Sequence, residues 1–436
     1  MTMNDEFKPD HTFGFHTRAI HAGARPEPST GARAIPIYQT SSYVFEDPES
    51  AAAYFNLQEY GNTYSRIMNP TVASLEERLS NLDGGIGAVA FASGMAAQSA
   101  ALFTLLTPGD HMVASSALYG GTVTQLKHLS RKLAVGLTFV DPDNLSAWRN
   151  ALNDKTKILY AETIGNPAGN ILDIEAVAAV AKDAGIPLMV DNTFATPYLC
   201  RPIEWGADIV VYSVTKFLGG HGTSIGGAVV DSGEFDWSNG NFPIVADPSP
   251  AYHELEFHET FGGYGYLMKL RAETLRDLGG AMSPFNAFLF LQGLETLPLR
   301  MDRHVGNALA VAKWLGARDD VATVRHPALN PKYCPLVAKY LPKGAGAVFC
   351  FDLDGGRQAG QDFIRGTRLF SHLANVGDAK SLIIHPASTT HRQLNDEELA
   401  AAGIGPGTIR LSIGIEDVDD LIWDLEQGFA RIGTQE

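Results

Sequence analysis

The stretch that decides the fold is GADIVVYSVTKFLGGHG, residues 206–222. Its first half is apolar and rich in β-branched residues, which is typical of a strand buried on both faces. The chain then presents Ser213, Thr215 and Lys216 together and runs into glycines. A lysine at such a place can be no more than a solvated loop cation, because most lysines lie at the surface. The rest of the chain has to decide whether Lys216 does more.

Strands and helices alternate from about residue 70 to residue 230. The helical stretch TVASLEERLSNL places Leu75, Leu79 and Leu82 on one face, and DIEAVAAVAKDAG is closed by Gly185 and Pro187. Short apolar segments between such helices are predicted strands, at 88–92, 111–115, 137–140, 157–162, 187–191, 208–213 and 226–230. Continuously apolar strands that alternate with helices predict an α/β fold, with a mostly parallel sheet covered on both faces.

The chain divides into three parts, and the alternation of strands and helices lies in the middle one. Residues 1–70 carry turn formers and little periodicity, so they are predicted to be an N-terminal arm that reaches onto a partner subunit. Residues 71–282 form the large domain. Residues 283–436 begin with a helix that starts at Pro284 after a capping Ser283 and continues to about residue 316, with a kink at Pro298. The strand-like GAVFCFDL and TIRLSIGIE, around a helix at about 360–374, then predict a smaller C-terminal α+β domain.

Composition narrows the class of protein. The chain has 436 residues and a net charge of -16, which argues against binding to nucleic acid or to an anionic membrane surface. No apolar run approaches the ~20 residues of a membrane span, and the first residues lack the apolar core of a secretory signal. The three widely spaced cysteines, Cys200, Cys334 and Cys350, indicate reduced core thiols in the cytoplasm rather than disulfides or a metal site.

Two motifs are rejected on their context. GIGAVA (85–90) matches a dinucleotide fingerprint, but that fingerprint needs a strand before the glycines and a helix through them, whereas here a helix comes first. HELEFH (253–258) resembles a zinc helix, but its histidines are five residues apart rather than four and would lie on different helix faces. No metal site is predicted.

Three features fall where open α/β sheets bind ligands, at the carboxyl ends of strands. Ser93, Gly94 and Met95 open a helix directly after a strand, where free backbone N–H groups favour a phosphate, although many such turns bind nothing. Asp191 ends another strand, either as a structural cap or as a site carboxylate. The stretch from Ser213 to Lys216 is the third.

Together these features predict a pyridoxal 5′-phosphate site. The turns at Gly94 and at Ser213 and Thr215 would share the phosphate, and Lys216 would form the Schiff base. The carboxylate would keep the pyridine nitrogen protonated, so that the ring can accept electrons.

The chain resembles the Cys/Met-metabolism family of pyridoxal-phosphate enzymes along nearly its whole length. The matching motifs, in the family's order, are YSRIMNPT (64–71), FASGMAA (91–97), LYGGT (118–122), ETIGNP (162–167), VDNTF (190–194), SVTKFLGGHG (213–222) and RLSIGIED (410–417). The resemblance implies the fold-type I architecture, with a seven-stranded large-domain sheet that agrees with the strand count above. It also implies a homotetramer built of tight dimers.

The resemblance implies a role for each matching residue. Lys216 would hold the cofactor, Asp191 would pair with its ring nitrogen, and Tyr119 would stack on the ring. Other cofactor contacts would come from Ser93, Gly94, Met95, Ser213 and Thr215, and from Tyr64 and Arg66 of the neighbouring subunit. Asn166, Asn375 and Arg410 would hold the substrate carboxylate. Lyase members commonly carry a serine where this chain has Asn375, so the carboxylate clamp is expected to differ in detail.

Within the family, the chain is most similar to members that use O-acetylhomoserine. The opening HTRAIHAG and IPIYQTSSYVFED and the long segment at roughly 232–282 carry this similarity. It implies a transferase of methionine biosynthesis, in which O-acetylhomoserine plus sulfide or methanethiol gives homocysteine or methionine plus acetate.

Other activities stay open at this point. Within the family they are methionine or cystathionine γ-lyase and cystathionine γ-synthase; outside it they are a dehydrogenase and a non-catalytic binding protein. Methionine-cleaving members carry a cysteine at the position of Gly121, so free methionine is expected to be a poor substrate.

Overall fold

The computed structural model describes residues 12–389 and 404–433, and the first 11 residues of the expected arm lie outside this range. A seven-stranded sheet, in the order β1-β7-β6-β5-β4-β2-β3, forms the centre of the larger part of the molecule. Strand β7 is antiparallel to both its neighbours, and the other neighbouring strands are parallel. The expectation of an α/β fold with a seven-stranded, mostly parallel sheet is therefore confirmed. The strands are β1 (Gly87–Phe91), β2 (His111–Ser115), β3 (Gly136–Val140), β4 (Thr156–Glu162), β5 (Leu188–Asp191), β6 (Ile209–Tyr212) and β7 (Gly227–Asp231).

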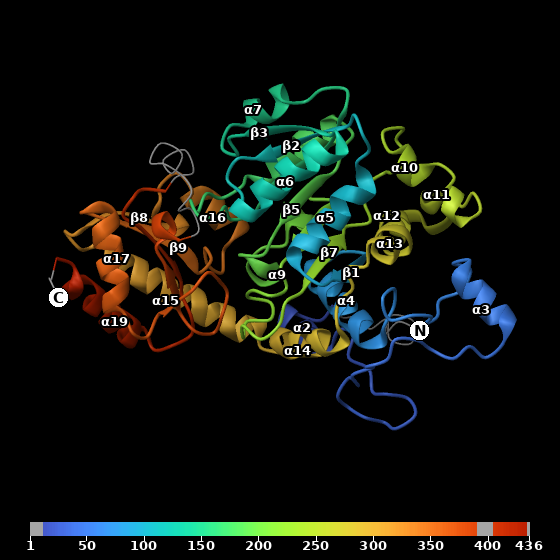
Figure 1. The fold of residues 1–436 in the computed structure, drawn as a ribbon, viewed down its shortest axis with the longest axis horizontal. Coiled ribbons are helices and arrows are strands. Elements are labelled where there is room, and N and C mark those ends of the chain that lie inside the picture. Colours follow the sequence, from blue (N-terminus) through green and yellow to red (C-terminus); the bar gives the residue numbers. More distant parts are fainter. Residues whose placement is uncertain (1–11, 390–403, 434–436) are drawn as a thin grey trace.

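Helices separate these strands except β6 and β7, which a long turn connects, and α5 and α6 lie across the front of the sheet in Figure 1. Helix α4 begins where the Asn69 side chain accepts hydrogen bonds from two backbone N–H groups, and it ends at Gly84, whose φ is 83°. Its Leu75, Leu79 and Leu82 are fully buried, as their spacing predicts. The helices of this part are α4 (Pro70–Asp83), α5 (Gly94–Leu105), α6 (Gly120–Leu133), α7 (Leu145–Asn150), α8 (Ile174–Asp183) and α9 (Thr196–Leu199).

The segment that follows β7 is made of short helices. A π-helical turn, Leu270–Leu275, lies between two of them and packs against α5. The other elements are α10 (Pro243–Ala246), α11 (Phe257–Phe261), α12 (Gly265–Lys269) and α13 (Arg276–Leu278).

A second, five-stranded sheet lies beside the first part and has the order β10-β11-β12-β9-β8. Its strands are β8 (Val321–Arg325), β9 (Val348–Leu353), β10 (Ser371–His372), β11 (Leu382–Ile384) and β12 (Thr408–Ser412). The helices of this part are α14 (Pro284–Glu295), α15 (Leu297–Gly316), α16 (Cys334–Tyr340), α17 (Gly356–Gly366) and α19 (Val418–Arg431).

Three details of the C-terminal half differ from the sequence-based expectations. Helix α14 starts at Pro284 as expected, but Ser283 makes no side-chain cap. The helical run breaks at Thr296, two residues before Pro298, because a proline cannot donate to the preceding turn. The helix expected at about 360–374 ends at Gly366, and strand β10 occupies residues 371–372.

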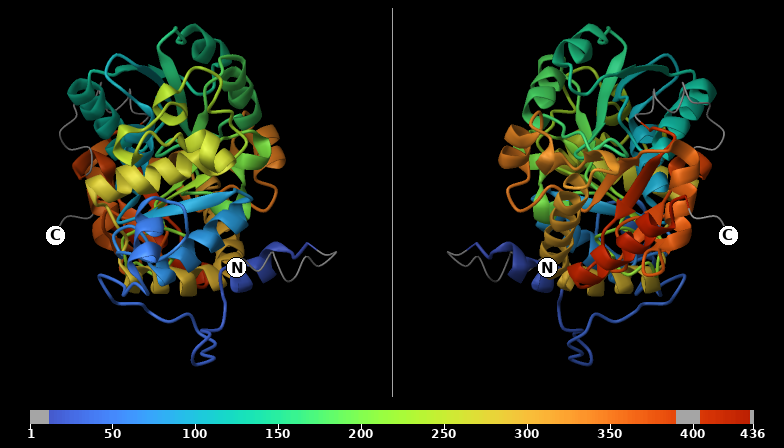
Figure 2. Two further views of the ribbon diagram at one scale, coloured as in Figure 1. Left: turned by 90° about the vertical axis from the view of Figure 1, so that its right-hand side faces the viewer. Right: turned by 90° about the vertical axis from the view of Figure 1, so that its left-hand side faces the viewer.

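Among the described residues before α4 there are two short helices, α2 (Phe15–His21) and α3 (Pro48–Phe55). Helix α2 packs against α4 and α14, whereas part of the chain that follows it extends away from the rest of the molecule in Figure 2. It exposes large apolar side chains, among them Val44 at 100%, Phe55 at 61% and Tyr60 at 78%. Large exposed apolar patches are found at surfaces that bind other proteins, membranes or ligands.

Two further findings bear on the compositional expectations. Cys200 and Cys350 are buried, but Cys334 is exposed, so the expectation of a core thiol is wrong for Cys334. In the described residues, no helix is both long and apolar enough to cross a membrane.

Candidate active site

A cavity of about 250 Å³ opens at the carboxyl ends of β4, β5 and β6, between the two sheets. All the predicted site residues except Tyr64 and Arg66 line it, although they are spread over more than 300 positions of sequence. The lining residues are Ser93, Gly94, Met95, Gln98, Tyr119, Thr122, Glu162, Ile164, Asn166, Asp191, Thr193, Phe194, Ser213, Thr215, Lys216, Ile225, Ala374, Asn375, Val376 and Arg410.

Lys216 lies in a tight turn directly after β6. Its side-chain amine donates a hydrogen bond to Oδ1 of Asn375, from the smaller part of the molecule. Burial, and secondly the nearby positive charge of Arg410, lower the pKa of Lys216. A buried amine with a lowered pKa is a better nucleophile and base than a surface lysine, because more of it is neutral.

An arginine outside the cavity wall holds the turn that carries Lys216. The Arg300 guanidinium, on α15, donates to the carbonyl oxygens of Phe217 at 2.7 Å and Leu218 at 3.2 Å. It also donates to the carbonyl oxygen of Gly293 at 2.7 Å, and it forms no ion pair with any described carboxylate. Burial lowers the pKa of Arg300 to about 10.

Asp191 ends β5 and faces the cavity. One carboxylate oxygen accepts the backbone N–H of Thr193 at 2.9 Å, and no cation of the described chain pairs with this carboxylate. Burial raises the pKa of Asp191. A buried carboxylate without a cation is complementary to a protonated ring nitrogen, which would supply the missing charge.

The first turn of α5 forms another wall of the cavity. The Ser93 side chain caps it by accepting the N–H of Ala96 at 3.1 Å, and the N–H groups of the first turn have no partner within a helix. A Cβ at Gly94 would lie 2.8 Å from Cα of Ser213, so glycine lets the start of α5 approach the end of β6. These two backbone segments make a cradle for an anion.

In the turn after β6, the Thr215 hydroxyl and the Ser213 backbone N–H already have hydrogen-bond partners within the protein. The Thr215 hydroxyl donates to the carbonyl oxygen of Gly226 at 3.1 Å and accepts the N–H of the same residue at 3.0 Å. The Ser213 backbone N–H donates to the Thr193 hydroxyl at 2.9 Å. To donate to a phosphate, the Thr215 hydroxyl would have to turn away from Gly226.

Sequence reasoning missed Glu162, which lies beside Asp191 because their Cα atoms are partners in the parallel pair β4–β5. Its Oε1 accepts the backbone N–H of Tyr119 at 2.6 Å, and the Tyr119 side chain is 49% exposed at the cavity. Burial, and secondly the neighbouring Asp191, raise the pKa of Glu162 well above its usual value. Its position at the end of a buried strand, the signal that found Asp191, would have found Glu162 as well.

Arg410, on β12, is the cationic wall of the cavity. Within the described residues, its guanidinium makes only long hydrogen bonds, at 3.5 Å to Oδ1 of Asn166 and at 3.5 Å to the carbonyl oxygen of Asn375. No described carboxylate pairs with it, and burial lowers its pKa. An unpaired guanidinium of this kind suits a carboxylate ligand.

Tyr64 and Arg66 lie outside the cavity of their own chain. The Arg66 guanidinium stacks over the Tyr64 ring at 5.4 Å and donates to the carbonyl oxygen of Arg276. Both side chains are exposed to solvent.

The cavity thus joins a lysine with a lowered pKa, an unpaired carboxylate and an anion cradle, which together fit pyridoxal phosphate. Comparison with known proteins agrees. Residues 16–430 match the family described as "Cys/Met metabolism PLP-dependent enzyme".

Individual relatives extend the comparison over the whole chain. The O-acetyl-L-homoserine sulfhydrylase of Leptospira meyeri is 49% identical, over 99% of this chain and 98% of that protein. The homocysteine synthase of Schizosaccharomyces pombe is 48% identical, over 95% and 97%. A crystal structure of a putative O-acetylhomoserine (thiol)-lyase from Campylobacter jejuni, which contains an N′-pyridoxyl-lysine-5′-monophosphate, superposes with a TM-score of 0.92. It is 39% identical and covers 96% of this chain and 100% of that chain. The chain therefore belongs to the Cys/Met metabolism family of pyridoxal-phosphate-dependent enzymes.

Proposed function

We propose that this enzyme catalyses a γ-replacement, in which O-acetylhomoserine and sulfide give homocysteine and acetate. Methanethiol in place of sulfide would give methionine. The observation that carries the proposal is the single cavity that joins Lys216, the unpaired Asp191, the anion cradle at Gly94 and the unpaired Arg410. The sulfhydrylase and homocysteine synthase names of relatives at 44–49% identity support the choice of substrate.

Each wall of the cavity would hold one part of the reactants. The turns at Ser93–Met95 and Ser213–Thr215 would bind the cofactor phosphate, and Asp191 would accept a hydrogen bond from the ring nitrogen. Tyr119 would lie against the ring face. Arg410, with Asn166 and Asn375, would bind the substrate α-carboxylate and so fix the direction in which the side chain points.

When bound, pyridoxal phosphate supplies a carbonyl group that a primary amine can attack and a ring that accepts electrons from the neighbouring carbon atoms. Asp191 would keep the ring nitrogen protonated, which strengthens that capacity. The neutral amine of Lys216 would remove the proton from Cα, pass it on so that the amine is neutral again, and then remove the proton from Cβ of the substrate. The carbon–oxygen bond at Cγ breaks, acetate leaves with the bonding electrons, the sulfur of hydrosulfide forms the new bond at Cγ, and protons return to Cβ and Cα.

Gly121 bears on the choice between replacement and cleavage of a thioether. A Cβ at this position would lie 2.9 Å from Cζ of the Tyr119 ring, so no side chain fits there while the ring keeps its place. The site accordingly lacks a group at residue 121 that could assist a poor leaving group. Acetate leaves more readily than a thiolate and needs less assistance, which favours an ester substrate.

The test compares kcat/KM for two reactions of the purified holoenzyme, because that ratio measures differential binding of the transition state. We expect homocysteine from O-acetylhomoserine plus sulfide at a much higher kcat/KM than α-ketobutyrate from methionine. The opposite order, with methanethiol released from methionine, would replace this proposal with a γ-lyase.

We also infer a division of labour along the chain. Residues 71–282 would bind the cofactor, residues 283–436 would complete the substrate site, and residues 1–70 would contact other subunits of a homotetramer built of tight dimers. The exposed apolar side chains of the segment before α4 support the last point. The exposed position of Tyr64 and Arg66 is compatible with their reaching the cofactor phosphate of the neighbouring subunit.

A further inference from the structure

The loop that carries Tyr64 and Arg66 is attached to its own subunit by a buried arginine of the π-helical turn. One nitrogen of Arg271 donates to the carbonyl oxygen of Ile67 at 2.9 Å. The other donates to Oε2 of Glu76 at 2.7 Å and to the carbonyl oxygen of Ala88 at 3.2 Å. A single guanidinium therefore joins the loop, helix α4 and strand β1.

Glu76 extends this network toward the cofactor phosphate. Its second oxygen accepts the backbone N–H of Ala90 at 2.8 Å, on the strand that leads into the turn at Ser93 and Gly94. The side chains of Arg271 and Glu76 are only 16% and 9% exposed. A buried pair with this many satisfied hydrogen bonds holds its parts in one arrangement, because each bond broken would leave a buried polar group unpaired.

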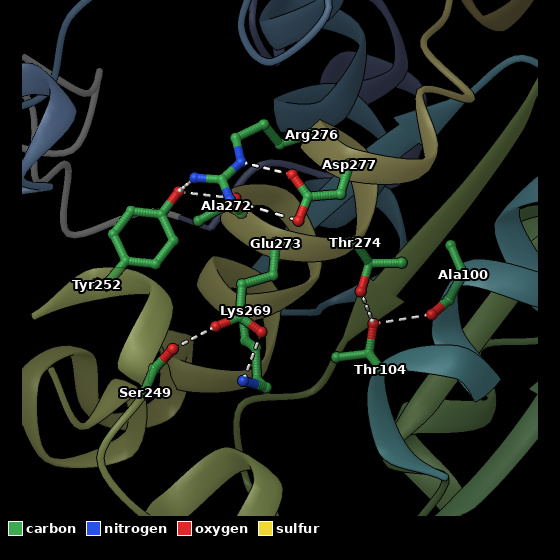
Figure 3. Close-up of polar contacts among 10 residues, drawn as sticks. All are labelled: Ala100, Thr104, Ser249, Tyr252, Lys269, Ala272, Glu273, Thr274, Arg276 and Asp277. Carbon is green, nitrogen blue, oxygen red and sulfur yellow. Dashed lines mark hydrogen bonds and ion pairs between the residues drawn. The ribbon is translucent and has the colours of Figure 1, made fainter. Parts of the chain in front are cut away.

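The π-helical turn itself is held from both sides, as Figure 3 shows. The Thr274 hydroxyl lies 2.7 Å from the hydroxyl of Thr104 on α5, the helix that begins at Gly94. On the other side, Glu273 accepts the Ser249 hydroxyl at 2.6 Å, and the Arg276 guanidinium donates to the Tyr252 hydroxyl at 2.7 Å. The backbone carbonyl oxygen of the same Arg276 accepts the hydrogen bond from Arg66.

An ion pair alone would not need this geometry. A lysine could neutralise Glu76, but its single nitrogen would have to replace the two nitrogens with which Arg271 binds the loop, α4 and β1. The nitrogen of Arg271 that does not bind Glu76 therefore binds the loop. Two attachments of the loop to the body, through Arg271 and through the Arg276 carbonyl, come from one continuous helical run, in which the π-helical turn leads directly into α13.

We propose that Arg271 is a positioning residue for the cofactor site of the neighbouring subunit, acting through the Tyr64–Ile67 loop. This inference rests on the proposed role of Tyr64 and Arg66 and adds the element that holds them. It also gives the segment at 232–282 a function: its π-helical turn supports the loop that leaves the subunit.

The experiment measures the dissociation constant of pyridoxal phosphate for the full-length protein after dialysis, by titration followed in absorbance. We expect Arg271→Lys to weaken cofactor binding about tenfold and Arg66→Ala to weaken it at least as much. Arg271→Lys added to the variant Tyr64→Phe, Arg66→Ala should weaken binding no further, because Arg271 acts through these two side chains of the loop. The matched control is Arg365→Lys, which makes the same change in an exposed arginine that pairs with Asp362 on α17 in the smaller part of the molecule, and its dissociation constant should stay within twofold.

The outcomes separate this inference from the proposal on which it rests. Unchanged binding in Arg66→Ala would refute the shared site itself. Weakened binding in Arg66→Ala with unchanged binding in Arg271→Lys would refute the role of Arg271 only. A further loss when Arg271→Lys is added to the variant Tyr64→Phe, Arg66→Ala would also refute it, because general loosening of the structure weakens binding even without these two side chains, whereas positioning through them does not. If Arg271→Lys fails to fold, the pair Arg271→Gln and Glu76→Gln, which removes both buried charges together, replaces it in every comparison.

Discussion

Arg300 offers a quantitative test of how the turn at Lys216 is held in place. Replacing it by methionine leaves the buried carbonyl oxygens of Phe217 and Leu218 without their donor, while the carbonyl oxygen of Gly293 keeps only the hydrogen bond from the Thr296 hydroxyl at 3.3 Å. An orphaned buried acceptor costs roughly 1–3 kcal/mol, so two cost about 4 kcal/mol at the middle of that range, and the hydrogen bond lost at Gly293 adds about 1 kcal/mol.

The variant also removes an unfavourable charge. Burial lowers the pKa of Arg300 from 12.5 to about 10, and each pKa unit corresponds to roughly 1.4 kcal/mol, so the desolvated guanidinium costs about 3 kcal/mol. The difference predicts that Arg300→Met destabilises the enzyme by about 2 kcal/mol. Arg300→Lys should fall between, because an ammonium keeps a charge but cannot serve all three oxygens.

The assay is urea unfolding of the holoenzyme at fixed protein and cofactor concentrations, followed by far-ultraviolet circular dichroism and by the visible absorbance of the bound cofactor. The matched control is Arg303→Met on the same helix, whose partner Asp417 is exposed, and it should change the free energy of unfolding by less than about 1 kcal/mol. A loss below about 1 kcal/mol in Arg300→Met would refute the view that this arginine holds the turn.

Three further outcomes are expected. Lys216→Ala should lose nearly all turnover and the visible absorbance of the resting holoenzyme; an unchanged spectrum, with borohydride still fixing the cofactor, would exclude Lys216 as its attachment. Arg66→Ala should retain cofactor poorly, and mixing it with Lys216→Ala subunits should restore part of the activity; well-mixed hybrids without activity would argue against a shared site. Burial lowers the pKa of His304 to about 4, whereas an unfolded histidine titrates near 6.5. Its contribution to stability is therefore complete above pH 6.5 and declines as pH falls toward 4, and His304→Gln should remove on the order of 3 kcal/mol of the decline. If the free energy of unfolding of the wild type and of His304→Gln fell in parallel between pH 7 and 4, His304 would not cause this part of the decline.

Much of the candidate site could be predicted because its residues follow strands. Asp191, Ser213 and Lys216 come directly after apolar segments, and parallel strands end at one edge of a sheet, so their meeting follows from the strand pattern. Arg300 and Arg271 gave no such signal. Arg300 binds a backbone carbonyl 82 residues away and Arg271 binds one 204 residues away, and nothing in the sequence around either arginine indicates so distant a contact.

The sequence by itself determined the elements whose cause is local: the alternating helices and strands, the seven-stranded sheet, and the glycine that lets α5 approach β6. Tertiary structure decided where the cause is distant. Helix α17 ends at Gly366, and the buried Asp424 carboxylate then accepts the backbone N–H groups of residues 368, 369 and 370 at 2.7–2.9 Å, which gives their donors a partner outside a helix. The direction of Arg66, away from its own cavity, likewise depends on a carbonyl 210 residues along the chain. Periodicity records which face of an element is apolar, but only the packed chain sets which distant polar group satisfies which backbone atom.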